Sequence, residues 1–186
     1  TIDVADGKTL TYSGASLSLG AYTLTMSGGG RFSNTNHLDL NNASSKLLLS
    51  NSITVDSVRT SLASLGLDVD NNSTVTSLTV AHTTPVSIAS GRTLSGAITV
   101  SAGSIKLDEA GTLASTIAMS GGTLDIDETL TLSGALTQSG DITIDVADTK
   151  TLTYTGTAVS LGANTLTLSG GGTLSNTNAL VLNDAN

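Results

Sequence analysis

Acidic residues recur in this chain at intervals that could place them side by side. Asp127 follows Asp108 by nineteen residues, and Asp145 follows Asp127 by eighteen. If coils of about this length stack, carboxylates in one rank lie about 5 Å apart and repel each other unless water or a cation intervenes. Since Ca²⁺ takes oxygen ligands of this kind, Asp108, Asp127 and Asp145 form a candidate calcium ladder. We favour the alternative of solvated charges that block sideways strand addition, because the nine-residue glycine-rich calcium repeat does not recur.

Residues suited to catalysis are few. Paired carboxylates can cleave glycosidic bonds, and Asp125, Asp127 and Glu128 form the densest acidic group. The chain has no Trp and only three dispersed Tyr, which leaves little for a sugar ring to stack on. The two histidines, His37 and His82, are expected to be exposed turn residues, and they offer no Ser-His-Asp arrangement. The sequence therefore predicts no enzyme and no cofactor, with calcium as the one alternative.

The tripeptide Thr-Leu-Thr occurs at 9–11, 23–25, 129–131, 151–153 and 165–167. Outward ranks of threonine on a flat solenoid are also used to bind ice. The copies lie 14, 22 or more residues apart, so they are not expected to form one rank. Threonine here is interpreted as a good β-former on a solvated strand.

A long internal repeat organises the whole chain. Residues 143–186 align with residues 1–44 without a gap at an offset of 142, and 31 of the 44 positions are identical. We therefore divide the chain into one complete unit, residues 1–142, and the start of the next, residues 143–186. Repetition on this scale indicates an array that grows along one axis, with both parts in the same continuous structure.

A shorter period lies inside the long one. Residues 91–109 and 110–128 have their large apolar residues in register, and the apolar-x-apolar rhythm marks short strands with one buried face. The prediction is an all-β parallel β-helix, expected to be right-handed, with about twenty residues and three short strands per coil and about seven coils per unit. A β-sandwich would explain the alternation but not the nineteen-residue register. The predicted core comprises Leu10, Leu24, Leu94, Ile98, Ile105, Leu107, Leu113, Ile117, Leu124, Ile126, Leu152 and Leu166.

One stretch fits this pattern poorly. Between Val58 and Asn72, the spacing of Val58, Leu62 and Leu65 is typical of a helix. We expect a short helical bulge or a loop there.

Composition limits the classes of partner. The net charge is −8, and the seven basic residues are scattered, which argues against nucleic acid and against an anionic membrane surface. No apolar run approaches the roughly 20 residues needed to span a bilayer. There is no cysteine, so disulfides and thiolate sites are excluded.

Runs such as TLTLSGG (165–171), with Gly, Asn and Asp at the corners, resemble the β-helical repeats of secreted bacterial surface proteins. These include filamentous-haemagglutinin-type adhesins, autotransporter passengers and giant repetitive surface proteins. The resemblance implies an extracellular, cell-surface fibre or stalk and carries over no functional residue. The expected partners are further copies, continued covalently or joined end to end. Two alternatives stay open: an adhesin that contacts cells or glycans through outward corners, with 58–72 as the candidate stretch, and a polysaccharide-cleaving β-helix enzyme.

Overall fold

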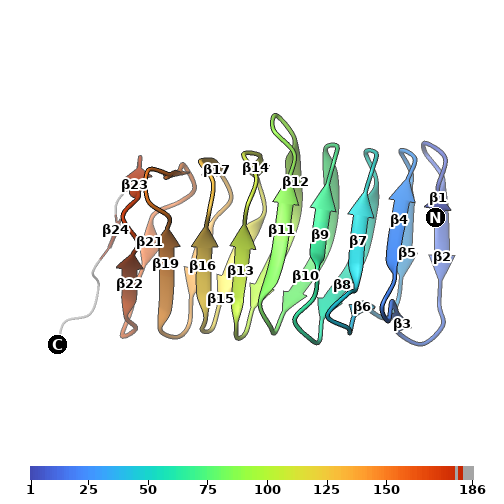
Figure 1. Ribbon diagram of the computed structural model, residues 1–186, viewed down its shortest axis with the longest axis horizontal. Helices are drawn as coiled ribbons and strands as arrows, with labels where there is room; N and C mark the ends of the chain where they lie inside the picture. The colour runs from blue at the N-terminus through green and yellow to red at the C-terminus, as the bar shows by residue number, and fades with distance from the viewer. Residues whose placement is uncertain (179, 182–186) are drawn as a thin grey trace.

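The computed structural model describes residues 1–178, 180 and 181. Within them the chain is all-β and winds as a parallel β-solenoid of about nine turns (Figure 1). Each turn, or coil, places about three short strands on three faces. All strand pairs are parallel, and each pair joins equivalent strands of neighbouring coils. The predicted β-helix with coils of about twenty residues is confirmed. Among the described residues, no helix has the length and hydropathy to cross a lipid bilayer.

The strands form one continuous rank on each of the first two faces and a broken rank on the third. The first face holds β1 (Ile2–Asp3), β4 (Thr23–Ser27), β7 (Lys46–Leu49), β9 (Gly66–Val69), β11 (Thr84–Ile88), β13 (Ser104–Leu107), β16 (Thr123–Ile126), β19 (Ile142–Val146) and β22 (Leu166–Ser169). The second holds β2 (Thr9–Tyr12), β5 (Arg31–Asn34), β8 (Thr54–Thr60), β10 (Ser73–Val80), β12 (Thr93–Val100), β14 (Thr112–Leu113), β17 (Leu130–Leu132), β20 (Thr151–Tyr154) and β23 (Thr173–Asn176).

The third face is built from shorter pieces. The long strands β8, β10 and β12 continue onto it from the second face and pair with one another there. At the ends of this trio, β8 also pairs with β6 (Leu38–Leu40) and β12 with β15 (Thr116–Met119). The remaining strands of this face are β3 (Leu17–Ser18), β18 (Leu136–Gln138), β21 (Val159–Ser160) and β24 (Leu180–Val181). Coils are numbered from the N-terminus, so that coil one is β1–β3, coil seven is β16–β18 and coil eight is β19–β21.

Inward Leu, Ile and Val stack into ladders along the axis. Ile105 pairs with Leu124 and Leu107 with Ile126, as the nineteen-residue period predicts. Burial of such side chains stabilises the stack by roughly 25 cal/mol per Å² of apolar surface removed from water. Nine of the twelve predicted core residues are at most 2% exposed: Leu94, Ile98, Ile105, Leu107, Leu113, Ile117, Leu124, Ile126 and Leu152.

The other three predicted core residues are less buried. Leu24 and Leu166 are partly buried and pack against the core. Leu10 is 44% exposed, although its counterpart in the second copy, Leu152, is 1% exposed. The prediction fails for Leu10 because it lies in coil one, where no coil covers it from below.

The segment Val58–Asn72 contains no helix, so the helical bulge expected there was wrong, and the loop is limited to short corners such as 61–65. It contributes the end of β8 and the whole of β9, and Val58 is buried. Leu62 and Leu65 lie on the corner between them and are 50% and 53% exposed. Backbone pairing with the coils on both sides overrides the local helical spacing.

The corner before the second face shows how closely the two copies match. In the first copy the Lys8 N–H donates to the Ala5 carbonyl at 3.0 Å across a tight turn, and Gly7 has φ of 67°. In the second copy Lys150 and Ala147 make the same bond, but Thr149 replaces the glycine and keeps φ at 65°. A side chain is disfavoured in this left-handed region, so the second copy carries local strain.

Thr149→Gly is therefore expected to raise the free energy of unfolding by about 1 kcal/mol. Gly7→Thr should lower it by a similar amount, because a Cβ at Gly7 meets no atom within 4 Å and the change acts through the backbone alone. Urea unfolding with an unchanged m-value measures both. A destabilising Thr149→Gly would show that the threonine side chain makes a compensating contact.

Candidate functional site

The structure places the three predicted ladder residues in two ranks. Asp127 lies one coil above Asp108, since the Asp127 N–H donates to the Leu107 carbonyl at 2.9 Å. Asp145, however, is in register with Asp125. The predicted calcium ladder is therefore wrong at Asp145. The coil between Asp125 and Asp145 has twenty residues, whereas the predicted ladder assumed eighteen. Asp145 therefore pairs two positions earlier than predicted, and a shift of two residues leaves the same side chains pointing outward.

A lysine and two serines relieve the repulsion between these carboxylates. Lys106 forms an ion pair with Asp127 and lies 4.0 Å from an oxygen of Asp125. Ser87 Oγ donates to Asp108 at 2.6 Å, and the hydroxyl of Ser169 donates to Asp145. In the described part of the chain, no group of three or more His, Cys, Asp or Glu side chains is placed to hold a metal ion.

The Asp125 carboxyl keeps an unfavourable environment despite Lys106. Burial raises its pKa, and the neighbouring carboxylates of Asp127 and Asp145 raise it further, whereas Lys106 opposes the shift. The pKa of Lys106 is raised mainly by its hydrogen bond to Asp127. This outward acidic edge holds a network of opposed charges between coils six, seven and eight.

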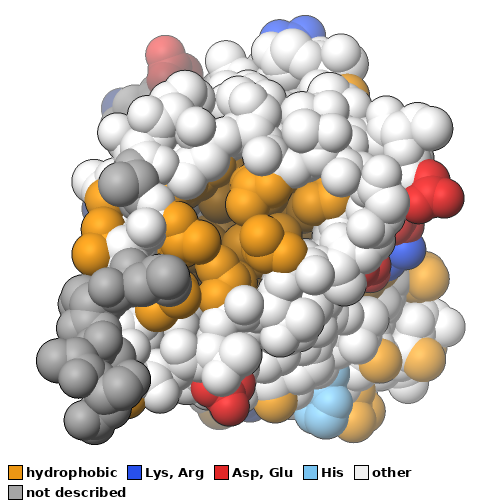
Figure 2. Space-filling view, turned by 90° about the vertical axis from the view of Figure 1, so that its left-hand side faces the viewer, with side chains coloured by type: hydrophobic (Ala, Val, Ile, Leu, Met, Phe, Trp, Pro, Cys, Tyr) orange, Lys and Arg blue, Asp and Glu red, His pale blue; other side chains and the backbone are white. Residues whose placement is uncertain are grey.

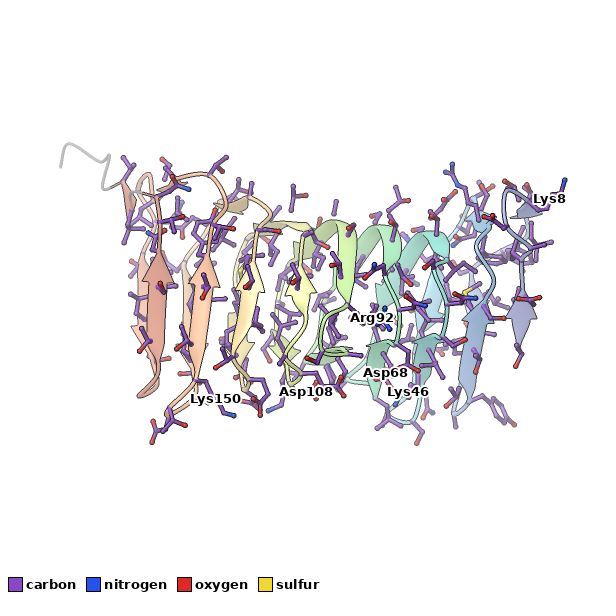
Figure 3. The ribbon with its side chains drawn as sticks, turned by 90° about the horizontal axis from the view of Figure 1, so that it is seen from above. Lys8, Lys46, Asp68, Arg92, Asp108 and Lys150 are labelled. Carbon is purple, nitrogen blue, oxygen red and sulfur yellow. The ribbon has the colours of Figure 1, made fainter. Side chains whose placement is uncertain are left out.

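Most basic side chains of the protein join one coil to the next. Arg31 Nε lies 2.7 Å from Asp56, and Arg59 Nη2 lies 2.6 Å from Asp39. Burial raises the pKa of Asp39, but hydrogen bonds from Arg59 and Ser61 outweigh it and lower the pKa. Similar inter-coil pairs join Lys46 to Asp68 (Figure 3) and Lys150 to Glu128.

The histidines lie apart from any catalytic arrangement. His82 is exposed, as predicted, but His37 is half-buried, with its Nδ1 2.7 Å from Ser57 Oγ. This Ser–His contact joins two coils, and sequence spacing gave no sign of it. It lacks the third member of a triad, because the nearby Asp39 carboxylate is paired with Arg59.

Two of the Thr-Leu-Thr copies stack after all. Thr131 is in register with Thr153, and the Thr151 N–H donates to Thr129 Oγ1 at 3.1 Å. Their separation of 22 residues is the local coil length. The five copies together form no single rank, as expected, because they lie on two different faces.

The interior is open at the C-terminal end of the described stack. An apolar hollow there is lined by Leu132, Leu136, Leu152, Leu166 and Leu174, among others. Leu168 and Leu180 are 52% and 41% exposed nearby. Figure 2 shows apolar side chains gathered at the centre of this end within a polar rim.

Comparison of the chain with protein-family models, with curated proteins and with solved structures finds no match. The class of the protein is therefore defined by its fold, a repetitive all-β parallel solenoid. Its charged and hydroxyl side chains mainly connect neighbouring coils.

Asp125→Asn tests the acidic edge. The pKa of Asp125 is higher in the folded protein than its ordinary value of 3.8. The protonated carboxyl therefore adds to the free energy of unfolding below pH 3.8, and this stabilisation is lost as the pH rises through the pKa of the folded state. Asparagine keeps the shape without the charge, so at about pH 7 the free energy of unfolding should rise by less than about 1 kcal/mol. The gain should vanish near about pH 3.

Urea unfolding at both pH values measures this effect. Asp70→Asn is the matched control, because it removes the same charge from an exposed corner. A loss of stability at neutral pH in Asp125→Asn would show that attraction to Lys106 outweighs burial and carboxylate repulsion.

Proposed function

We propose that this chain is a structural segment of an extracellular fibre or stalk on a microbial surface, built from repeated 142-residue units. The observation that carries the proposal is the unbroken backbone ladder on two faces, which runs through all nine first-face strands. Seven of these strands, β1 to β16, precede β19, which contains the counterparts of Ile2 and Asp3. The second copy thus begins a whole number of coils after the first, so units can follow one another in one orientation.

The mechanism is mechanical. Each coil is tied to its neighbours by parallel strand pairing, by stacked apolar residues and by ion pairs such as Arg59–Asp39. Bending the rod would stretch all three kinds of contact on one side. Such a role needs no catalytic group. The likeness to secreted bacterial repeats supports the extracellular location, and further units are the proposed partners.

Rod length tests the proposal. Chains extended by one and two further 142-residue units should lengthen by about 34 Å per unit at constant width, because seven coils rise about 4.8 Å each. Small-angle X-ray scattering and electron microscopy measure both dimensions. An antibody against the chain should also label intact cells of the source organism. Compact particles, or labelling only after permeabilisation, would contradict the fibre and its location respectively.

An adhesin is the second candidate, and one observation favours it. Tyr22, Leu62 and Leu65 are 76%, 50% and 53% exposed on corners that lead back to the first face. Exposed large apolar side chains mark a contact site where they form a contiguous patch. If the chain is an adhesin, the double variant Leu62→Ser and Leu65→Ser should bind host or neighbouring cells less without shortening the rod. Unchanged cell binding would leave the fibre role alone.

A further inference from the structure

An open polar groove of about 400 Å³ lies at the corner that leads into the second face, where coils three, four and five meet. Among the described residues, none of those that line the groove is charged. Its lining therefore offers neutral hydrogen-bonding groups, which suit an uncharged ligand with many hydroxyls. The polar lining includes Ser52, Thr54, Asn72, Thr74, Thr93 and Ser95.

Two of these residues belong to a known modification motif. Asn72 and Thr74 are the first and third residues of Asn72-Ser73-Thr74, which has the form Asn-x-Ser/Thr. Asparagine in this motif accepts an N-linked glycan on the surface of a secreted protein. So short a motif arises easily in a chain rich in Asn, Ser and Thr, and its structural context decides whether it can be used.

The context of Asn72 suits an acceptor. Asn72 is exposed on the corner between β9 and β10. Its Oδ1 accepts the Thr93 N–H at 3.0 Å, which holds the side chain in place, whereas its Nδ2 makes no hydrogen bond with any described residue. The half-buried Thr74 lines the same groove, and its hydroxyl likewise has no hydrogen-bond partner in the described part of the chain. The acceptor nitrogen and the motif hydroxyl are therefore both available.

The overlapping motif, Asn71-Asn72-Ser73, lacks this context. Ser73 is 5% exposed, and its hydroxyl lies 2.9 Å from the Asn51 carbonyl oxygen. The Asn71 Nδ2 already donates to Asn51 Oδ1 at 3.4 Å. The motif hydroxyl is buried and both groups have partners, so Asn71 is the poorer acceptor.

A further motif, Asn42-Ala43-Ser44, lies outside the groove. Asn42 is half-buried in a tight turn, where its Oδ1 accepts the Ser44 N–H at 2.9 Å. The second copy of the long repeat has Asp184-Ala185-Asn186 at these positions, so this motif is not repeated. Among the three motifs, the structural context favours Asn72.

We propose that Asn72 is N-glycosylated, and that the polar groove beside it leaves room and hydrogen-bonding partners for the first sugar. The donor is a glycosyl diphosphate, carried by a nucleotide or by a lipid, and a separate transferase brings it to the corner. The Asn72 Nδ2 forms a bond to the anomeric carbon, while the bond from that carbon to the diphosphate oxygen breaks. The diphosphate leaves with the electron pair, and the Nδ2 proton passes to a base of the transferase.

The consequence for a fibre rests on the proposed function. In an array of 142-residue units, this acceptor would recur once per unit along one edge, about 34 Å apart. Because an N-linked glycan is bulky and solubilising, it would keep neighbouring rods apart on that edge. The modification itself requires only the exposed acceptor and a transferase.

Mass spectrometry of the intact chain, purified from the source organism and digested with trypsin, tests the acceptor. Residues 60–92 form the peptide that contains Asn71 and Asn72, and residues 32–46 form the control peptide that contains Asn42. Electron-transfer fragmentation keeps the glycan attached and assigns it to one residue. We expect a glycan on Asn72 and none on Asn71 or Asn42. An unmodified 60–92 peptide, or a glycan on Asn71 or Asn42 in place of Asn72, would overturn the proposal.

The mass of the glycan distinguishes the two donors. A single hexose, or a short series built on it, indicates a nucleotide-linked donor. One uniform oligosaccharide indicates a preassembled, lipid-linked donor. Both results support the acceptor.

Variants made in the same organism test the recognition signal. Thr74→Val keeps the β-branched shape but removes the hydroxyl, so the glycan should be lost from Asn72. Thr74→Ser keeps the hydroxyl and should remain glycosylated. Asn72→Asp keeps an acceptor for the Thr93 N–H, so it should lose the glycan and retain the fold, which circular dichroism checks. Wild-type glycosylation of Thr74→Val would show that the motif is not recognised and would contradict the proposal.

These results are separate from the test of the fibre. A chain without a glycan can still form rods that lengthen with each added unit. A glycosylated chain that forms compact particles would keep Asn72 as an acceptor and reject the fibre.

Discussion

The short strands of this protein depend on hydrogen bonds to equivalent strands in neighbouring coils, and most have a partner both above and below. Strands of two to eight residues cannot satisfy their own backbone groups, and no coil can bury its apolar edge alone. Stacking solves both problems at once, since parallel pairing brings equivalent residues together and the inward side chains form ladders. The same requirement explains why so much of the side-chain chemistry lies between coils.

The exposure of Leu10 in coil one and the hydrogen bond of Tyr154 between coils seven and eight follow from this dependence. Leu10 and Leu152 are the same residue in two copies of one sequence, yet only Leu152 is buried, because only it has a coil on both sides. Where the third-face ladder is interrupted, a tyrosine hydroxyl supplies the missing partner.

Stacking also forces like charges together, because a residue meets its counterpart one coil away. Asp125 and Asp145 are in register on the outer surface. The protein limits the repulsion with Lys106 and with serine hydroxyls. The pKa of Asp125 is nevertheless raised, first by burial and then by the neighbouring carboxylates of Asp127 and Asp145. At Asp39 and Asp56 the balance is reversed, since arginine and serine hydrogen bonds outweigh burial and lower the pKa of both carboxyls.

By itself the sequence determined the all-β class, the parallel stacking and the coil length, because the spacing of large apolar residues records which positions face inward and how often the chain returns. It also predicted the pairing of Ile105 with Leu124. Only the tertiary structure decided the rank of Asp145, the strands within Val58–Asn72, the exposure of Leu10 and the contact of His37 with Ser57. The physical reason is that a strand's alternation is unchanged by a shift of two residues, so partners across coils depend on corner lengths that the pattern does not record.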